Sequence, residues 1–219
     1  MTWNLPHDLT PWAHHLEATY IALTLGRPPP PPLVSAELEA RALDAVVAAA
    51  ACAVAARFLA VGKPRSLGVV SDDPQRAAAL FAGHRVWHQP TDVRWAGRAA
   101  ADPAILAAGG RAVSLEEAVT ADIVCLDVRA ELRNAAVRRG SHINLLDGTA
   151  DDELRARAEC YAEVATAGHT ATLGELAAGI RDGRQLDEIT LLLAVRDAGA
   201  GADGLAIARR ALGAACLAP

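Results

Sequence analysis

The segment from Pro64 to Ala77, PRSLGVVSDDPQRA, constrains the fold of this chain most. A short apolar run, Leu67 to Val70, leads into a four-residue turn and then into an alanine-rich stretch. A strand, a tight turn and a helix in this order are typical of the first unit of a dinucleotide-binding domain, whose turn normally carries glycines. Here the turn is Ser71-Asp72-Asp73-Pro74 and contains no glycine. The segment therefore predicts the fold of such a domain with an altered phosphate loop.

Composition narrows the class of protein. Of 219 residues, 52% are hydrophobic but only 4% are aromatic, so alanine, leucine and valine have to build the core. The formal net charge of −5 argues against a nucleic-acid partner, which would require a basic surface. The apolar stretch from Ala40 to Val61 contains Arg41, Asp44 and Arg57 and many alanines, which favours a buried helix over a membrane span.

Cysteine usage and the first residues indicate a cellular location. Four cysteines lie far apart without a C-x-x-C pair, which favours buried free thiols over disulfides or a zinc site. They are Cys52, Cys125, Cys160 and Cys216. The first residues do not have the pattern of a signal peptide. We expect a cytoplasmic protein.

Residues 1–32 are predicted to form an N-terminal extension. A helix over 10–25 would have Thr10 as its N-cap and Pro11 at its first position, and Gly26 would end it. Five consecutive prolines, Pro28 to Pro32, follow as a stiff spacer. A docking site for a proline-recognising partner is the alternative interpretation of the same prolines.

Residues 33–219 have the pattern of a doubly wound, mostly parallel, Rossmann-like α/β domain. A lead-in helix with Ser35 as N-cap is expected to reach about Val61. Short apolar runs then alternate with helical segments, as in a parallel sheet. Strands are predicted at 66–70, 85–88, 111–113, 121–127, 142–146 and 160–164, and helices at 74–82, 96–108, 115–119, 149–158, 171–181 and 203–214, with an apolar run at 188–195.

Four stretches, in order along the chain, carry a resemblance to a known family. They are ACAVAARFLA from Ala51 with RSLGVV ending at Val70, SLEEAVTADIV (114–124), RRGSHINLL (138–146) and LGELAAGIRDGRQLDEIT (173–190). From about residue 40 onward the chain resembles the ornithine cyclodeaminase/mu-crystallin family. This resemblance implies a Rossmann-like fold, and it implies NAD(P)-dependent enzymes among the relatives, including ketimine reductases and some alanine dehydrogenases.

The chain departs from the family at the positions that carry chemistry. The family's substrate domain, which supplies a catalytic lysine, is replaced by the short N-terminal extension, and no lysine precedes Lys63. An arginine–threonine pair of the family falls on Val47 and Ala48, which cannot clamp a carboxylate. The family's acidic catalytic residue has only Asp147 near its place, in a shifted register. We assign no catalytic residue and no metal ligand.

The family's glycine-x-glycine-x-glutamine loop falls on Ser71, Asp72, Asp73 and Gln75, with only the glutamine retained. Two carboxylates about 5 Å from a pyrophosphate, at an effective dielectric constant near 20, would each oppose binding by roughly 3 kcal/mol per charge pair. The simpler interpretation is that Ser71, Asp72 or Asp73 caps the helix that Pro74 begins. His88, in VWHQ, is predicted to end the second strand, where the family selects the ribose.

These observations predict a non-catalytic protein with a degenerate dinucleotide site and a structural, regulatory or ligand-binding function. A small-molecule ligand would occupy the cleft at the strand ends. Besides the loop residues, the cleft would be lined by Asp127, Arg129, Asn144, Asp147 and Gly148.

Two alternatives remain open. The first is an NAD(P)H-dependent imine or amino-acid reductase, or an ornithine cyclodeaminase-like lyase, with NAD(P) as its cofactor. The second is a dimeric partner-binding module in which Trp3, Trp12 and Tyr20 contact another protomer. A homodimer is expected, because apolar surface left without the substrate domain has to be covered, either by the N-terminal helix or by a second copy of the chain.

Overall fold

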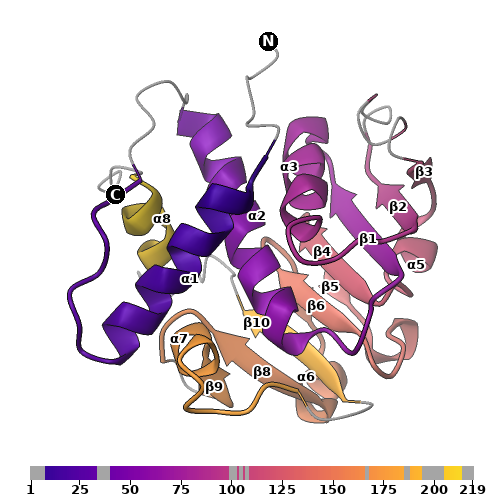
Figure 1. Cartoon of the computed structure of the whole chain (residues 1–219). Coiled ribbons are helices and arrows are strands. Elements are labelled where there is room, and N and C mark those ends of the chain that lie inside the picture. Colours follow the sequence, from indigo (N-terminus) through magenta and orange to yellow (C-terminus); the bar gives the residue numbers. More distant parts are fainter. Residues whose placement is uncertain are drawn as a thin grey trace.

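A parallel β-sheet forms the centre of the computed structural model, which describes residues 8–33, 40–98, 103, 106, 109–165, 168–184, 188–193 and 205–213. The strand order in the eight-stranded sheet is β3-β2-β1-β4-β6-β10-β8-β9, and every neighbouring pair is parallel (Figure 1). The strands are β1 (Ser66–Ser71), β2 (Asp92–Ala96), β3 (Arg111–Ala112), β4 (Ile123–Asp127), β6 (His142–Leu145), β8 (Ala158–Ala162), β9 (Ala171–Thr172) and β10 (Ile189–Leu193). The predicted doubly wound, Rossmann-like α/β fold is confirmed.

Helices cover both faces of the sheet. They are α1 (Thr10–Thr24), α2 (Ala40–Leu59), α3 (Pro74–His84), α5 (Leu115–Ala118), α6 (Asp152–Arg157), α7 (Leu173–Ala177) and α8 (Ala206–Leu212). A short helix η1 (Asn134–Ala136) and a separate parallel pair, β5 (Glu131–Leu132) with β7 (Thr149–Ala150), complete the elements.

Alternation along the strands sorts the core into two clusters. In β4, Ile123 and Cys125 pack with α1, α2, α3, α7 and α8, whereas Val124 and Leu126 pack with α5 and α6 on the opposite face. This is the period of two that a strand buried on both faces requires.

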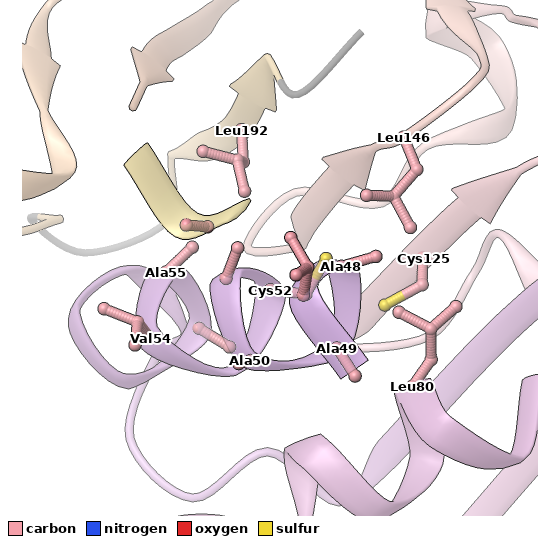
Figure 2. Close-up of a cluster of buried hydrophobic side chains, with 14 of the residues drawn as sticks. Ala48, Ala49, Ala50, Cys52, Val54, Ala55, Leu80, Cys125, Leu146 and Leu192 are labelled. Atoms are coloured by element: carbon pink, nitrogen blue, oxygen red, sulfur yellow. The ribbon is translucent and has the colours of Figure 1, made fainter. Parts of the chain in front are cut away.

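Helix α2 packs unusually close to its neighbours because its buried face is built of alanines. Ala48, Ala49 and Cys52 lie beside Cys125 of β4 and Leu80 of α3 in one buried cluster (Figure 2). In the described part of the chain, α2 is the helix long and apolar enough to cross a membrane, and 78% of its apolar window is buried inside the protein. The prediction of a buried, alanine-rich helix at this place agrees with that burial, and its proposed start at Ser35 lies outside the described residues.

Helix α1 packs on α2, α7 and α8 of its own chain. Trp12 and Tyr20 are buried there, so neither is available to a partner, and Trp3 lies outside the described residues. The predicted N-cap Thr10 is wrong, because the helix is preceded by Leu9, and Thr10 is already helical. Gly26 ends the helix as predicted, with a φ of 65°. The division of the chain at residue 32 stays a prediction.

The predicted second strand is also wrong in position. Residues 85–88 form a turn after α3, and β2 lies at 92–96, so it ends at the residue where a helix over 96–108 was predicted to begin. Most of the remainder of that helix lies outside the described residues. The strands predicted at 66–70, 111–113, 121–127, 142–146 and 160–164 are confirmed as β1, β3, β4, β6 and β8, with ends shifted by up to two residues.

Candidate functional site

The candidate site lies where the chain reverses its direction of winding, between β1 and β4. From β1 the chain winds to β2 and β3, and it then returns to β4 and β6 on the other side. Ligands of open parallel sheets bind outside the carboxyl ends of the strands at this kind of crevice. The last residues of the two strands, Ser71 and Asp127, are register partners, and the Ser71 hydroxyl donates to the Asp127 carboxylate over 2.9 Å. Two of the predicted site residues are therefore brought together.

The Asp73 side chain of the loop caps the amino end of α3. Oδ1 of Asp73 accepts the backbone N–H groups of Gln75 at 2.9 Å and of Arg76 at 3.3 Å. These amides belong to the set that a dinucleotide's pyrophosphate accepts from in a glycine-rich loop. The interpretation as a helix cap is confirmed, and the structure selects Asp73 from the three residues that were considered.

The crevice also contains a chain of four alternating charges. The guanidinium of Arg76 donates to both carboxylate oxygens of Asp127, at 2.8 and 2.6 Å, and to Asp44 of α2. Arg209 of α8 donates to the other oxygen of Asp44. Burial lowers the pKa of Arg76, but the carboxylates of Asp127 and Asp44 outweigh burial and raise the pKa above its ordinary value.

The Asp127 side chain is 4% exposed, so a ligand would first have to break this bidentate pair to reach it. Sequence reasoning missed Arg76, Asp44 and Arg209, because no local pattern indicates that α2, α3 and α8 converge.

The predicted ribose position is wrong. His88 lies before the start of β2, at the amino ends of the strands, whereas the crevice lies at their carboxyl ends. Its backbone N–H donates to the His84 carbonyl. Gly97 and Arg98 follow the true end of β2. The Arg98 backbone N–H donates to Asp72 at 2.9 Å, and its guanidinium is 92% exposed and 3.5 Å from the same carboxylate. A glycine–arginine pair after an alternating strand was the signal that could have located this residue.

The remaining predicted cleft residues divide between surface and core. Arg129 and Asp147 form an exposed ion pair with atoms 3.7 Å apart at the ends of β4 and β6. Gly148 is packed so closely that an added Cβ would lie 2.2 Å from Leu126. Asn144 is fully buried within β6 and does not line the crevice.

Asn144 belongs to a buried polar network beneath α2. Its Nδ2 donates to Cys125 Sγ at 3.5 Å, and its Oδ1 is 3.1 Å from Nε2 of His142. The other nitrogen of His142 is 2.9 Å from the Thr190 hydroxyl, so the Asn144 oxygen assigns the imidazole proton to Nε2. Burial, together with the nearby His84, lowers the pKa of His142 to about 3. This histidine is neutral and structural.

A thiol and a second imidazole meet in the same core. Cys125 Sγ is 3.8 Å from Nε2 of His84. Burial raises the pKa of the Cys125 thiol, but hydrogen bonding to Cys52 and the nearby His84 outweigh burial and lower the pKa to about 5. Cys52, Cys125 and Cys160 are free and buried as predicted, and Cys216 lies outside the described residues. Across the described ranges, no group of three His, Cys, Asp or Glu side chains is placed to hold a metal ion.

A separate cavity of about 450 Å³ opens at the amino ends of β8 and β10. Its lining includes Glu159, Tyr161, Ile180, Arg181 and Glu188, and it contains none of the predicted site residues. Nearby, Arg184 donates to the backbone carbonyls of Leu59 and Glu188. Arg184 therefore joins α2 to the start of β10.

The residues at the crevice do not fit a dinucleotide in the usual pose. Its pyrophosphate would have to displace the Asp73 carboxylate from the two amides and would then lie beside Asp72. A carboxylate about 5 Å from a pyrophosphate charge, without a compensating cation, opposes binding by roughly 3 kcal/mol per charge pair. The fold and this crevice together define a Rossmann-like α/β protein in which Asp73 of the loop after β1 caps α3.

Comparison with known proteins confirms the fold. No family model matches the chain, and no curated protein matches its sequence. An archaeal alanine dehydrogenase dimer with bound NAD superposes over 94% of this chain and 89% of that chain, with a TM-score of 0.75 and 17% identity. A probable ornithine cyclodeaminase from Bordetella pertussis Tohama I matches over 80% of this chain and 65% of that chain, with a TM-score of 0.65 and 22% identity.

The Δ1-pyrroline-2-carboxylate reductase of Thermococcus litoralis, in complex with NADH and L-proline, matches over 68% of this chain with a TM-score of 0.60 and 19% identity. This chain spans 58% of that reductase. The resemblance of the sequence to the ornithine cyclodeaminase/mu-crystallin family is thereby confirmed at the level of the fold.

Proposed function

We propose that this protein is a non-catalytic relative of the ornithine cyclodeaminase-like enzymes, with a ligand-binding or regulatory function. One observation carries the proposal: Asp73 accepts the backbone amides at the start of α3 that a pyrophosphate would need. The pairing of Asp127 with Arg76 and Ser71 supports it, because it occupies the polar groups at the switch point. Val47 and Ala48, which stand where the family has an arginine–threonine pair, are buried and cannot bind a carboxylate, which also supports a non-catalytic function.

Calorimetric titration with NADH and with NADPH tests this proposal. We expect no binding in the micromolar range to the full chain. The variant Asp72→Gly/Asp73→Gly removes both carboxylates and should tighten NADPH binding by at least about tenfold, since each charge pair opposes binding by roughly 3 kcal/mol. The variant Glu116→Gln/Glu153→Gln changes the net charge equally at exposed sites and should leave the affinity unchanged. Micromolar binding to the unaltered chain would overturn the proposal.

A second candidate function is NAD(P)H-dependent reduction of a cyclic imine or a 2-oxo acid. The superposition on an NAD-bound alanine dehydrogenase favours it, and so does Arg98. An exposed arginine after the second strand is suited to a ribose 2′-phosphate, so NADPH would be preferred to NADH. Cofactor oxidation with Δ1-pyrroline-2-carboxylate, or with pyruvate and ammonia, distinguishes the two functions. Turnover that Arg98→Ala weakens for NADPH but not for NADH would establish the second.

We further propose that the protein is a cytoplasmic homodimer. The matched alanine dehydrogenase is a dimer, and this chain exposes the large apolar side chains of Leu115 and Ile180. Sedimentation equilibrium of the full chain should give twice the monomer mass. A monomer at high micromolar concentration would contradict the proposal.

A further inference from the structure

Five consecutive prolines form an exposed strap between α1 and the body of the protein. The strap, defined as Arg27–Leu33, runs along the outside of the molecule from the end of α1 to α8 (Figure 1). Connection of two elements requires no proline, whereas a run of five leaves one backbone conformation. The composition therefore requires a separate explanation.

Both ends of the strap are fixed. At its start, the Gly26 backbone has a φ of 65°, and the Arg27 N–H donates to the Ala22 carbonyl at 2.8 Å, which closes α1. At its end, the Leu33 N–H donates to the Ala211 carbonyl of α8 at 3.0 Å, and the Leu33 side chain packs against the core. The strap is therefore held at the surface by contacts at both of its ends.

Proline chemistry favours polyproline II between these anchors. Each proline ring sets φ near −65°, and each following proline removes the helical region for the residue before it. No cis peptide bond occurs in the described residues. Polyproline II has three residues per turn, so residues three apart share one edge of the segment.

The exposure of the side chains follows this period of three. Pro30 and Leu33 are half-buried and share the inner edge, whereas Pro28, Pro29, Pro31 and Pro32 are exposed. The outward edges therefore carry two proline pairs, 28–29 and 31–32, separated by one inward residue. This is the spacing in which a P-x-x-P ligand presents two edges to an aromatic-lined groove and turns the third edge away.

The surroundings define the complementary surface. Arg27 lies three residues before Pro30, in line with the inner edge, but it is exposed at the start of the strap. Leu23 in the last turn of α1 and Leu25, which follows α1, are 43% and 42% exposed. A groove that covers the prolines would also meet one cation and a small apolar patch. Because the proline rings restrict the strap to the conformation that such grooves bind, little conformational entropy is lost on association.

We propose that this strap is a docking site for a partner protein with a proline-recognition groove that is lined by aromatic side chains and has an acidic rim facing Arg27. This proposal is independent of the function of the crevice, because the strap and the crevice share no residue. A second copy of this chain is the competing occupant.

The test uses the full chain and a panel of isolated SH3, WW and EVH1 domains as probes. Each isotope-labelled domain is titrated with the chain, and shifts of its groove resonances are followed. We expect saturable micromolar binding by at least one domain with an acidic groove rim, and weaker binding at high salt. Pro29→Ala/Pro32→Ala should weaken it by at least about tenfold. Pro30→Ala, on the inner edge, is the matched control and should change the affinity by less than about twofold.

Thermal unfolding of each variant verifies that the Leu33 anchor and the fold are retained. Arg27→Glu should weaken binding to the domain with the acidic rim without changing the melting temperature. Three results would overturn the proposal: binding by no domain of the panel, equal losses for the inner and outer proline variants, or self-association of the chain that the outer variant abolishes.

Discussion

At the scale of single residues, Asp73 provides the negative charge that stabilises the amino end of α3. Its carboxylate accepts two of the free amide groups there and lies where the partial positive charge of the helix is strongest. The neighbouring carboxylate of Asp72 accepts the backbone N–H of Arg98, lies 3.5 Å from the Arg98 guanidinium and is half exposed. Two adjacent aspartates therefore differ in what they stabilise.

Replacement of Asp73 by alanine should lower the free energy of unfolding by about 1 kcal/mol, the usual effect of losing an N-cap. Asp72→Ala is the matched control and should stay within about 0.5 kcal/mol of the unaltered protein. Urea denaturation at neutral pH measures both. Equal losses would show that the cap does not stabilise α3.

His142 makes the stability depend on pH. Its pKa in the folded protein is about 3, through burial and the nearby His84, against about 6.5 when unfolded. Between these values the unfolded chain binds a proton that the folded chain does not. This histidine therefore decreases the free energy of unfolding as the pH falls from about 6.5 towards 3, by up to about 1.4 kcal/mol per pH unit.

Urea denaturation over this pH range tests the contribution. His142→Gln should unfold more easily at neutral pH, because it disturbs the bonds to Asn144 and Thr190, yet its stability should fall less steeply in acid. His14→Gln, at an exposed position, should keep the original slope. An unchanged slope in His142→Gln would contradict the assignment.

At the scale of whole elements, the packing of α2 against α3 depends on a close approach of their backbones. Gly83 of α3 faces α2, and an added Cβ would lie 2.7 Å from the Ala49 carbonyl oxygen. Glycine inside a helix normally costs about 1 kcal/mol relative to alanine. Gly83 allows the backbone of α3 to contact the backbone of α2. The small alanine side chains of α2 permit the same close approach.

We therefore expect Gly83→Ala to destabilise the protein by about 1–3 kcal/mol, opposite in sign to the helix propensity. Thermal or urea unfolding gives the sign directly. Ala78→Gly, at a half-buried position of the same helix, is the control and should cost about 1 kcal/mol through propensity. Stabilisation by Gly83→Ala would show that α2 and α3 can separate without loss.

Strand β2 shows what local patterns can and cannot locate. The apolar pair in VWHQ suggested a strand at 85–88, but α3 continues to His84 and the turn follows it. The true strand, Asp92–Ala96, alternates buried Val93 and Trp95 with a half-buried Arg94 that pairs with Asp92. Its period of two was visible in the sequence, and the misplacement moved His88 into the site in place of Arg98.

On the scale of the whole molecule, α1 is part of the core and not an appendage. The Tyr20 hydroxyl donates to the buried Glu163 at 2.6 Å, and Glu163 also accepts the N–H groups of Ile207 and Ala208 at the start of α8. Leu16 is fully buried beside it. One carboxylate thus connects α1, β8 and α8.

A chain that begins at Leu33 should therefore fold poorly. Burial of a large side chain such as Leu16 or Tyr20 stabilises the folded state by about 1.5–3 kcal/mol. The free energy of unfolding of a whole domain is only about 5–15 kcal/mol. Circular dichroism and thermal unfolding would measure the loss. Leu23→Ala/Leu25→Ala, at exposed positions in and just after the last turn of α1, should stay within about 0.5 kcal/mol of the unaltered chain. A truncated chain with an unchanged melting temperature would contradict this prediction.

The sequence by itself determined the parallel sheet, most strand positions, the buried alanine-rich helix and the acidic turn after β1, because these follow from local periodicity and from residue types in one segment. Only the tertiary structure decided which aspartate caps α3, that Asn144 lies in the core, and that Asp44, Arg76, Asp127 and Arg209 meet at the crevice. Those four side chains come from α2, α3, β4 and α8, and pairing between charges so distant in sequence depends on how helices pack across the sheet.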